Sequence, residues 1–255
     1  MEFKLNNKKY ELSVAWQTTT LKQGIDIMAL DFPEKKLESL LEDDGSIIYD
    51  KDTIDYMRKV ISILSFCPYQ ELQHVDDKQI ESLWCLVSYI VKSLYLLDFS
   101  NYKPKGITEI NFLNKKYKLP KSLFIDDQEI LAYKEPSINI VEVSNLAMYL
   151  SEMKSKGLNS MKYICAILLK EDEGELYDEE KIAEKAKLFE QLPLSIAFEC
   201  FFFINYFSIN YLSSSINYLP QKEKVGVVKK ISNTILGYIQ SLKQVWSAIL
   251  MKLRK

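Results

Sequence analysis

The stretch Phe3-Lys4-Leu5-Asn6-Asn7-Lys8-Lys9-Tyr10-Glu11-Leu12 returns 107 residues later as Ile110-Asn111-Phe112-Leu113-Asn114-Lys115-Lys116-Tyr117-Lys118-Leu119. Both copies contain Asn-Lys-Lys-Tyr-x-Leu, preceded by an apolar residue two positions before the Asn. Apolar and polar residues alternate around a polar centre, which predicts two short strands joined by a turn. We place the turn at Asn7-Lys8 and Asn114-Lys115, because Asn tolerates the left-handed conformation of tight hairpins. Neither copy has Gly at the second turn position, so a longer loop is the alternative.

A second similarity follows each hairpin. Arg58 to Leu64 resembles Lys162 to Leu168 at an offset of 104 residues, and an acidic connection and another helix come next in each half. Chance agreement within a lysine-rich chain is the alternative, but the matching order of elements favours a duplication. The sequence therefore predicts a predominantly helical α+β fold of two duplicated units, each a short β-hairpin followed by helices, plus a long C-terminal amphipathic helix. The expected domains are 1–105, 106–220 and 221–255.

Caps and helix breakers give the expected element boundaries. Thr18-Thr19-Thr20 offers an N-cap for a helix over 21–30, which Pro33 stops. Pro68 closes a helix over 53–66, and the nearly apolar helix over 79–97 is expected at the centre of the first half. The other expected elements are hairpins over 1–14 and 109–120, strands at 134–136 and 138–141, and helices over 34–41, 142–155, 159–170, 178–190, 193–212 and 223–254.

Composition indicates an ordinary globular protein, with 47% hydrophobic and 27% charged residues. The charged N-terminal residues lack the apolar core of a signal peptide, so export is not expected. The longest apolar stretch, 196–212, is interrupted by Glu199, Asn205 and Asn210, which argues against a membrane span. Four scattered cysteines without a CxxC pair are interpreted as buried small hydrophobes in a reducing compartment. They are Cys67, Cys85, Cys165 and Cys200.

Residues for catalysis are scarce. The chain has one histidine, His74, in a polar connection, which we interpret as an exposed loop residue. No phosphate-binding, zinc-protease or calcium-loop motif occurs. The acidic run 171–180 does not match the ligand spacing of a calcium loop, and it is better explained as a solvated helix start. We therefore predict no catalytic, cofactor-binding or metal-binding residues. Any two acids can meet in a fold, but nothing in the sequence favours the paired carboxylates of a glycosidase.

The C-terminal segment is basic and amphipathic. Residues 222–255 contain eight basic residues and one acid, a net charge of +7, which leaves −9 for the rest of the chain. Their apolar residues recur at three- and four-residue intervals. This stripe could pack on the acidic body, bind another chain or form a homo-oligomer; a membrane surface is a weaker alternative, and nucleic acid is not expected. The candidate partner-binding residues are Val228, Ile231, Ile235, Tyr238, Leu242, Val245, Trp246 and Ile249.

Seven aromatic residues gather between 198 and 211, around most of the circumference of one predicted helix. This distribution predicts a buried helix, or a partner site if part of the surface is exposed.

Two stretches resemble bacteriophage tail assembly chaperone-like proteins. The first is Phe3 to Gly24, with the hairpin motif, Trp16 and the helix start Thr20-Leu21-Lys22-Gln23. The second is Met161 to Phe207, with Ala166-Ile167-Leu168-Leu169, an acidic insert and Phe201-Phe202-Phe203. Lys8 and Lys115 depart from the usual Gly of that group, and Ser13 from a common Pro that Pro120 supplies in the second copy.

The resemblance implies a protein without enzymatic activity, acting in the host cytoplasm during assembly or within the virion. Such chaperones hold a tape-measure protein while tail tube subunits assemble around it. We expect an adaptor that binds a tail, tape-measure or baseplate protein through apolar helical surfaces. The alternative is a permanent component of the virion, tail or baseplate. A third interpretation is an enzyme of an unrecognised family, for which we would expect a concave pocket with convergent polar side chains.

Overall fold

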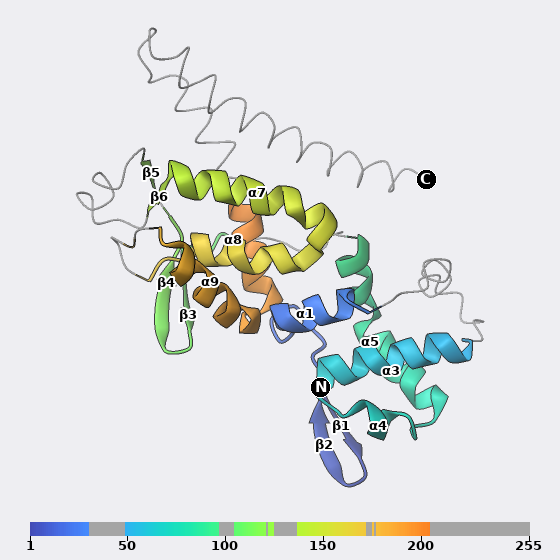
Figure 1. Cartoon of the computed structure of the whole chain (residues 1–255). Coiled ribbons are helices and arrows are strands. Elements are labelled where there is room, and N and C mark those ends of the chain that lie inside the picture. Colours follow the sequence, from blue (N-terminus) through green and yellow to red (C-terminus); the bar gives the residue numbers. More distant parts are fainter. Residues whose placement is uncertain are drawn as a thin grey trace. The chain divides into compact units, whose positions relative to one another are not determined.

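The computed structural model describes residues 1–30, 49–96, 105–120, 122–124, 137–171, 175 and 177–204 (Figure 1). The chain divides into two compact units, unit 1 over Met1–Asn101 and unit 2 over Tyr102–Lys255. The helices predicted over 34–41 and 223–254, and with them the domain predicted over 221–255, lie outside the described residues. Among the described helices, none combines the length and the apolar character that crossing a membrane requires.

Unit 1 is a hairpin followed by helices. Its hairpin is a two-stranded antiparallel sheet, and α3 packs against α1, α4 and α5. The expected helices are confirmed at α1, α3 and α5. The elements are β1 (Glu2–Leu5), β2 (Lys8–Glu11), α1 (Leu21–Met28), α3 (Lys51–Ser65), α4 (Tyr69–Leu72) and α5 (Asp77–Leu96).

Unit 2 repeats this order with an added parallel pair of short strands, β5 and β6. The strand predicted at 138–141 is only partly correct, because α7 begins at Ile140 under the control of an Asn139 cap. The elements are β3 (Glu109–Phe112), β4 (Lys115–Lys118), β5 (Ser122–Phe124), β6 (Ser137–Asn139), α7 (Ile140–Lys156), the 3₁₀ turn η2 (Gly157–Ser160), α8 (Met161–Leu168), α9 (Glu179–Leu188), the 3₁₀ turn η3 (Phe189–Gln191) and a helix over residues 194–204.

The two hairpins have the same register. Phe3 pairs with Tyr10 in unit 1, and Ile110 pairs with Tyr117 in unit 2. The predicted turn position is wrong by one residue: the two-residue loops are 6–7 and 113–114, and all four of these residues have positive φ angles between 48° and 63°. This is the type I′ geometry that matches the twist of the strands. The shared α+β plan of hairpin plus helices is confirmed.

Two capped helices also correspond. Thr20 caps α1 and Asn139 caps α7, each in a capping box closed by the side chain three residues later, Gln23 or Glu142. In both units that closing side chain is buried and reaches the end of the next matched helix. Gln23 Nε2 donates to the carbonyl oxygen of Ile63 in α3 at 2.9 Å, and Glu142 pairs with Lys170, two residues after α8.

The matched helices α3 and α8 form the centre of each unit. At an offset of 104 residues, four equivalent pairs along one face of these helices have both members buried. The pairs Met57/Met161, Val60/Ile164, Ile61/Cys165 and Leu64/Leu168 have an exposed fraction of at most 1%. The interiors of the two units therefore use the same helix face.

The final matched helices, α5 and α9, begin in the same way. The amide of Ile80 donates to the carbonyl oxygen of Asp76, and the amide of Ile182 donates to that of Asp178. The Asp76 side chain accepts from the Lys78 amide, and the Asp178 side chain accepts from the Glu180 amide. Asp76 and Asp178 thus mark the same position in the two units.

Candidate functional site

A glutamate fastens each hairpin to its helices, and we call this arrangement the clasp. In unit 1, Lys8 Nζ lies 2.8 Å from Glu71 Oε1, and the Tyr10 hydroxyl donates to Glu71 Oε2 at 2.9 Å. The bond from Lys8 lowers the pKa of the Glu71 carboxyl. Burial and the bond to Glu71 raise the pKa of Tyr10 to about 12.

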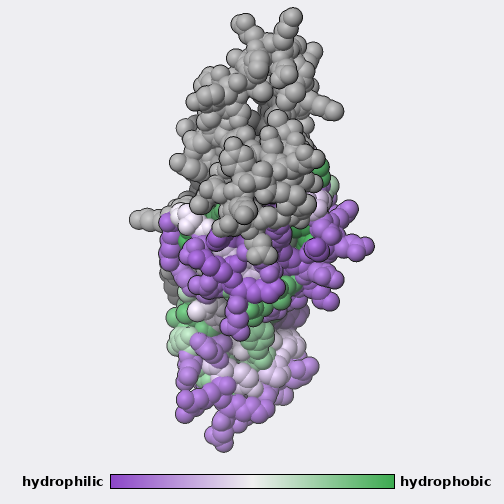
Figure 2. All heavy atoms as spheres, turned by 90° about the vertical axis from the view of Figure 1, so that its left-hand side faces the viewer, coloured by the Kyte–Doolittle hydropathy of each residue, from purple (hydrophilic) through white to green (hydrophobic). Residues whose placement is uncertain are grey.

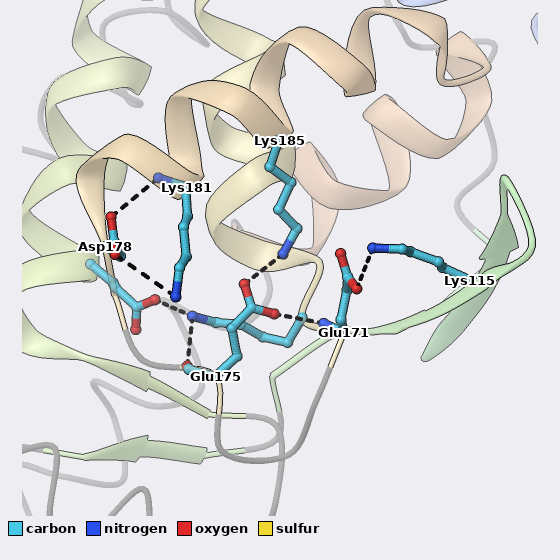
Figure 3. A network of polar contacts seen from close by, with 8 residues as sticks. Lys115, Glu171, Glu175, Asp178, Lys181 and Lys185 are labelled. Atoms are coloured by element: carbon cyan, nitrogen blue, oxygen red, sulfur yellow. Dashed lines mark hydrogen bonds and ion pairs between the residues drawn. The ribbon is translucent and has the colours of Figure 1, made fainter.

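Unit 2 has the lysine–glutamate half of this clasp. Lys115, the equivalent of Lys8, lies 2.8 Å from Glu171 Oε2, and Figure 3 shows it reaching from the hairpin toward that carboxylate. Tyr117, the equivalent of Tyr10, is fully buried, and among the described residues its hydroxyl has no hydrogen-bond partner. Burial raises the pKa of Tyr117 to about 12, and the negative charge of Glu171 shifts it in the same direction.

Beside this clasp lies a buried ion pair between Glu142 and Lys170. The two side chains are 0% and 1% exposed, and Lys170 Nζ also approaches the carbonyl oxygen of Glu175 at 3.4 Å. The other Glu142 oxygen accepts from the Asn139 amide at 2.8 Å, so every polar atom of the carboxylate is used. Burial raises the pKa of Glu142, against the opposing effect of Lys170.

Lys185 links the network to the aromatic core. Its Nζ lies 2.7 Å from Glu175 Oε1 (Figure 3). The same Nζ lies 5.5 Å from the centre of the Tyr117 ring. Phe189 packs edge-on against the same ring at 5.1 Å. Burial lowers the pKa of Lys185, although the charge of Glu175 opposes this shift. The ion pairs of Glu171, Glu142 and Glu175 together join the hairpin, α7, α9 and the segment that follows α8. We therefore interpret this network as what holds the elements of unit 2 together.

The acidic run 171–180 is therefore only in part the solvated helix start that was predicted. Asp178 does cap α9, accepting from the amides of Glu180 and Lys181. Glu171 and Glu175 instead form ion pairs with Lys115 and Lys185. Among the described residues, no group of histidine, cysteine and acidic side chains is arranged to hold a metal ion.

The candidate interaction site is one face of α5 in unit 1. Figure 2 shows that hydrophilic residues cover much of the described surface that faces the viewer. The α5 face differs, because four exposed residues at helical spacing carry no charge, and Trp16 lies edge-on against Tyr89 with ring centres 6.0 Å apart. The Tyr89 hydroxyl donates to the carbonyl oxygen of Val14 at 2.6 Å, which holds the ring in place. We define the α5 face as Ser82, Cys85, Leu86 and Tyr89.

Unit 2 supplies an internal comparison for this face. Aligning Asp76 with Asp178 places Leu86 opposite Leu188, and the two leucines are 37% and 38% exposed. The other equivalent positions, on α9 and the 3₁₀ turn η3, are also exposed but polar or charged, as a solvated helix face requires. They are Glu184 for Ser82, Lys187 for Cys85 and Gln191 for Tyr89. The α5 face is thus uncharged, whereas two of the equivalent exposed positions in unit 2 carry a charge. This difference distinguishes the α5 face from an ordinary solvated helix surface.

Most of the candidate residues named from the sequence do not belong to the α5 face. The predicted partner-binding residues Val228 to Ile249 lie outside the described residues. His74 is exposed in a turn, in agreement with the sequence. Three cysteines are buried as expected, but Cys85 is exposed, because it points away from the side of α5 that packs on α1 and α3. In the aromatic helix, Phe198 is fully buried and Phe201 to Phe203 are half-buried.

Comparison with known proteins identified no relative of this chain. No protein-family model, no curated protein and no solved structure matches this chain.

Proposed function

We propose that this chain is a non-enzymatic assembly adaptor of a bacteriophage, which binds a phage structural protein through the α5 face. The observation that supports a binding role is the uncharged, exposed surface of α5 at positions where unit 2 has Glu184, Lys187 and Gln191. The phage context follows from the resemblance of Phe3 to Gly24 and Met161 to Phe207 to tail assembly chaperone-like proteins. In this proposal the chain acts in the host cytoplasm during assembly.

The α5 face suits a helical partner. Leu86 and Tyr89 are three residues apart on one side of the helix, with Cys85 beside them, so they form a short ridge. Trp16 and Tyr89 supply rigid aromatic area, the kind of side chain that dominates binding energy in protein interfaces. A partner helix with small or apolar residues at three- and four-residue spacing would cover this ridge.

The experiment is co-expression of the full chain with tail, tape-measure and baseplate proteins of one phage, followed by sizing of the purified complex. The test variant is Cys85→Lys with Tyr89→Gln, which gives α5 the side chains that unit 2 already tolerates. The control is Glu184→Ser with Lys187→Cys, which gives α9 the side chains that the α5 face has at two equivalent positions. We expect a complex of fixed stoichiometry that survives the control and loses at least tenfold in affinity in the test variant.

Equal binding by the test variant would remove the α5 face from the proposal. Mass spectrometry of finished particles separates the chaperone from the alternative of a permanent virion component. A fixed copy number in particles would assign the chain to the virion.

A further inference from the structure

Another uncharged surface among the described residues lies on α7 in unit 2. Val141 and Met148 are 50% and 44% exposed, and Ser151 is exposed on the same side one turn further on. The only charged residue of α7 before Glu152 is Glu142, and it is buried. The solvent side of this helix therefore has no charge over three turns, an unusual property for a surface helix.

An acidic border runs along one side of this surface. Tyr149 lies on α7 next to the exposed residues, and the pKa of its hydroxyl is raised by burial and by the charges of Glu152 and Glu179, among others. Tyr149 stacks on Tyr163 of α8 with ring centres 4.7 Å apart, and α8 packs against α9, so α9 lies on the Tyr149 side of α7. Glu179 and Glu180 are exposed in the first turn of α9, after the N-cap Asp178. The surface thus combines an apolar strip with a negative edge.

The chain itself contains a segment with the complementary pattern. Residues 222–255 have a net charge of +7, and their apolar residues recur at three- and four-residue intervals with lysines between them. The described residues end at 204, so 17 residues, 205–221, lie between them and this segment. A connection of that length spans up to roughly 55 Å when extended, enough to reach any part of unit 2.

We propose that residues 222–255 bind intramolecularly to the α7 surface, with their apolar stripe on Val141 and Met148 and their lysines beside Glu179 and Glu180. The tether raises the local concentration of the segment, so modest contacts are sufficient. Because the stripe contains Val228 to Ile249, this proposal gives those residues an internal site. It is independent of the α5 face and of the phage context.

Limited trypsin digestion of the full chain tests the proposal, because the segment contains seven cleavage sites, which follow Lys222, Lys224, Lys229, Lys230, Lys243, Lys252 and Arg254. The reference is a synthetic peptide of residues 222–255, which gives the intrinsic cleavage rate. We expect cleavage within 222–255 to be about tenfold slower in the full chain than in the peptide, since proteolysis follows the population of the open form. High salt should reduce this protection, because it screens the acidic edge.

The test variant is Val141→Asp with Met148→Asp, and the control is Leu188→Asp, an exposed leucine of the same unit away from α7. Circular dichroism and urea unfolding check that all chains fold alike. We expect the test variant, and not the control, to be cleaved at the peptide rate. Equal protection in both variants would overturn the proposal. Protection that rises with protein concentration would also overturn it, because the occupant would then be the segment of a second copy.

Discussion

Glu142 and Lys170 form a fully buried ion pair, and Glu142 stands where unit 1 has Gln23. Gln23 needs no counter-charge, because its amide donates to the Ile63 carbonyl. The acid in unit 2 requires a cation, and Lys170 supplies it. The equivalent side chain therefore connects the capped helix to the next matched helix through a neutral hydrogen bond in unit 1 and through an ion pair in unit 2.

Removing one member of this pair should be costly. We expect Lys170→Met to lower the free energy of unfolding by about 3 to 5 kcal/mol, since it leaves the Glu142 carboxylate buried without a partner. The double variant Lys170→Met with Glu142→Gln should recover most of this loss, because it imitates unit 1. Urea unfolding of the single and double variants measures the difference. If the double variant lost more unfolding free energy than Lys170→Met alone, the unpaired Glu142 carboxylate would not be the cause of the destabilisation.

The two clasp tyrosines should respond differently to loss of the hydroxyl. Tyr10→Phe removes the bond to Glu71 and should destabilise the protein by about 1 kcal/mol. Tyr117→Phe removes a buried hydroxyl with no partner among the described residues, so it should be neutral or slightly stabilising. Chemical unfolding of both variants tests the contrast. A loss of 1 kcal/mol or more in Tyr117→Phe would contradict it.

Tyr117 should also make stability fall at alkaline pH. Its folded pKa is about 12, above the value of about 10 for an unfolded tyrosine, so between these pH values only the unfolded chain loses the proton. The stabilisation is complete below pH 10 and is lost as pH rises toward 12, by about 2 to 3 kcal/mol for this residue. Unfolding free energies of wild type and Tyr117→Phe across this range isolate the effect. If the unfolding free energies of the two proteins changed in parallel with pH, Tyr117 would not be the cause of the loss of stability.

The hairpin loops provide an exchange test. Leu113 occupies a left-handed position at φ 49°, where hairpin 1 has Asn6 at φ 48°. Because Asn tolerates this conformation better than Leu, Leu113→Asn should stabilise unit 2 by about 0.5 to 1 kcal/mol. The reverse change, Asn6→Leu, should destabilise unit 1 by a similar amount. Thermal unfolding of both variants provides the readout, and shifts of the same sign would contradict the assigned turn.

Sequence reasoning found the elements with strong local signals. The Asn-Lys-Lys-Tyr repeat predicted both hairpins, and Thr20 predicted the start of α1. The turn position was missed because Leu113 has no turn preference, so only the structure shows that it takes a left-handed conformation.

Side-chain partners were harder to predict. The clasp acids Glu71 and Glu171 are 100 residues apart while their hairpins are 107 apart, so insertions conceal the match. The pair Glu142 and Lys170 joins residues 28 positions apart, without a local pattern. The α5 face was missed because that helix is apolar on most sides, and sequence alone does not show which side is packed. A comparison of α5 with α9 after alignment at Asp76 and Asp178 could have found it.

The central claim is that the two halves are copies of one folding module. Its most direct test is nuclear Overhauser spectroscopy of the full chain, with attention to the Hα atoms of two cross-strand pairs. In hairpins with two-residue loops at 6–7 and 113–114, Lys4 faces Lys9 and Asn111 faces Lys116 in non-hydrogen-bonded pairs with close Cα atoms. We expect strong Hα–Hα contacts for both pairs. A contact in only one hairpin, or contacts shifted by one residue in either, would contradict the claim.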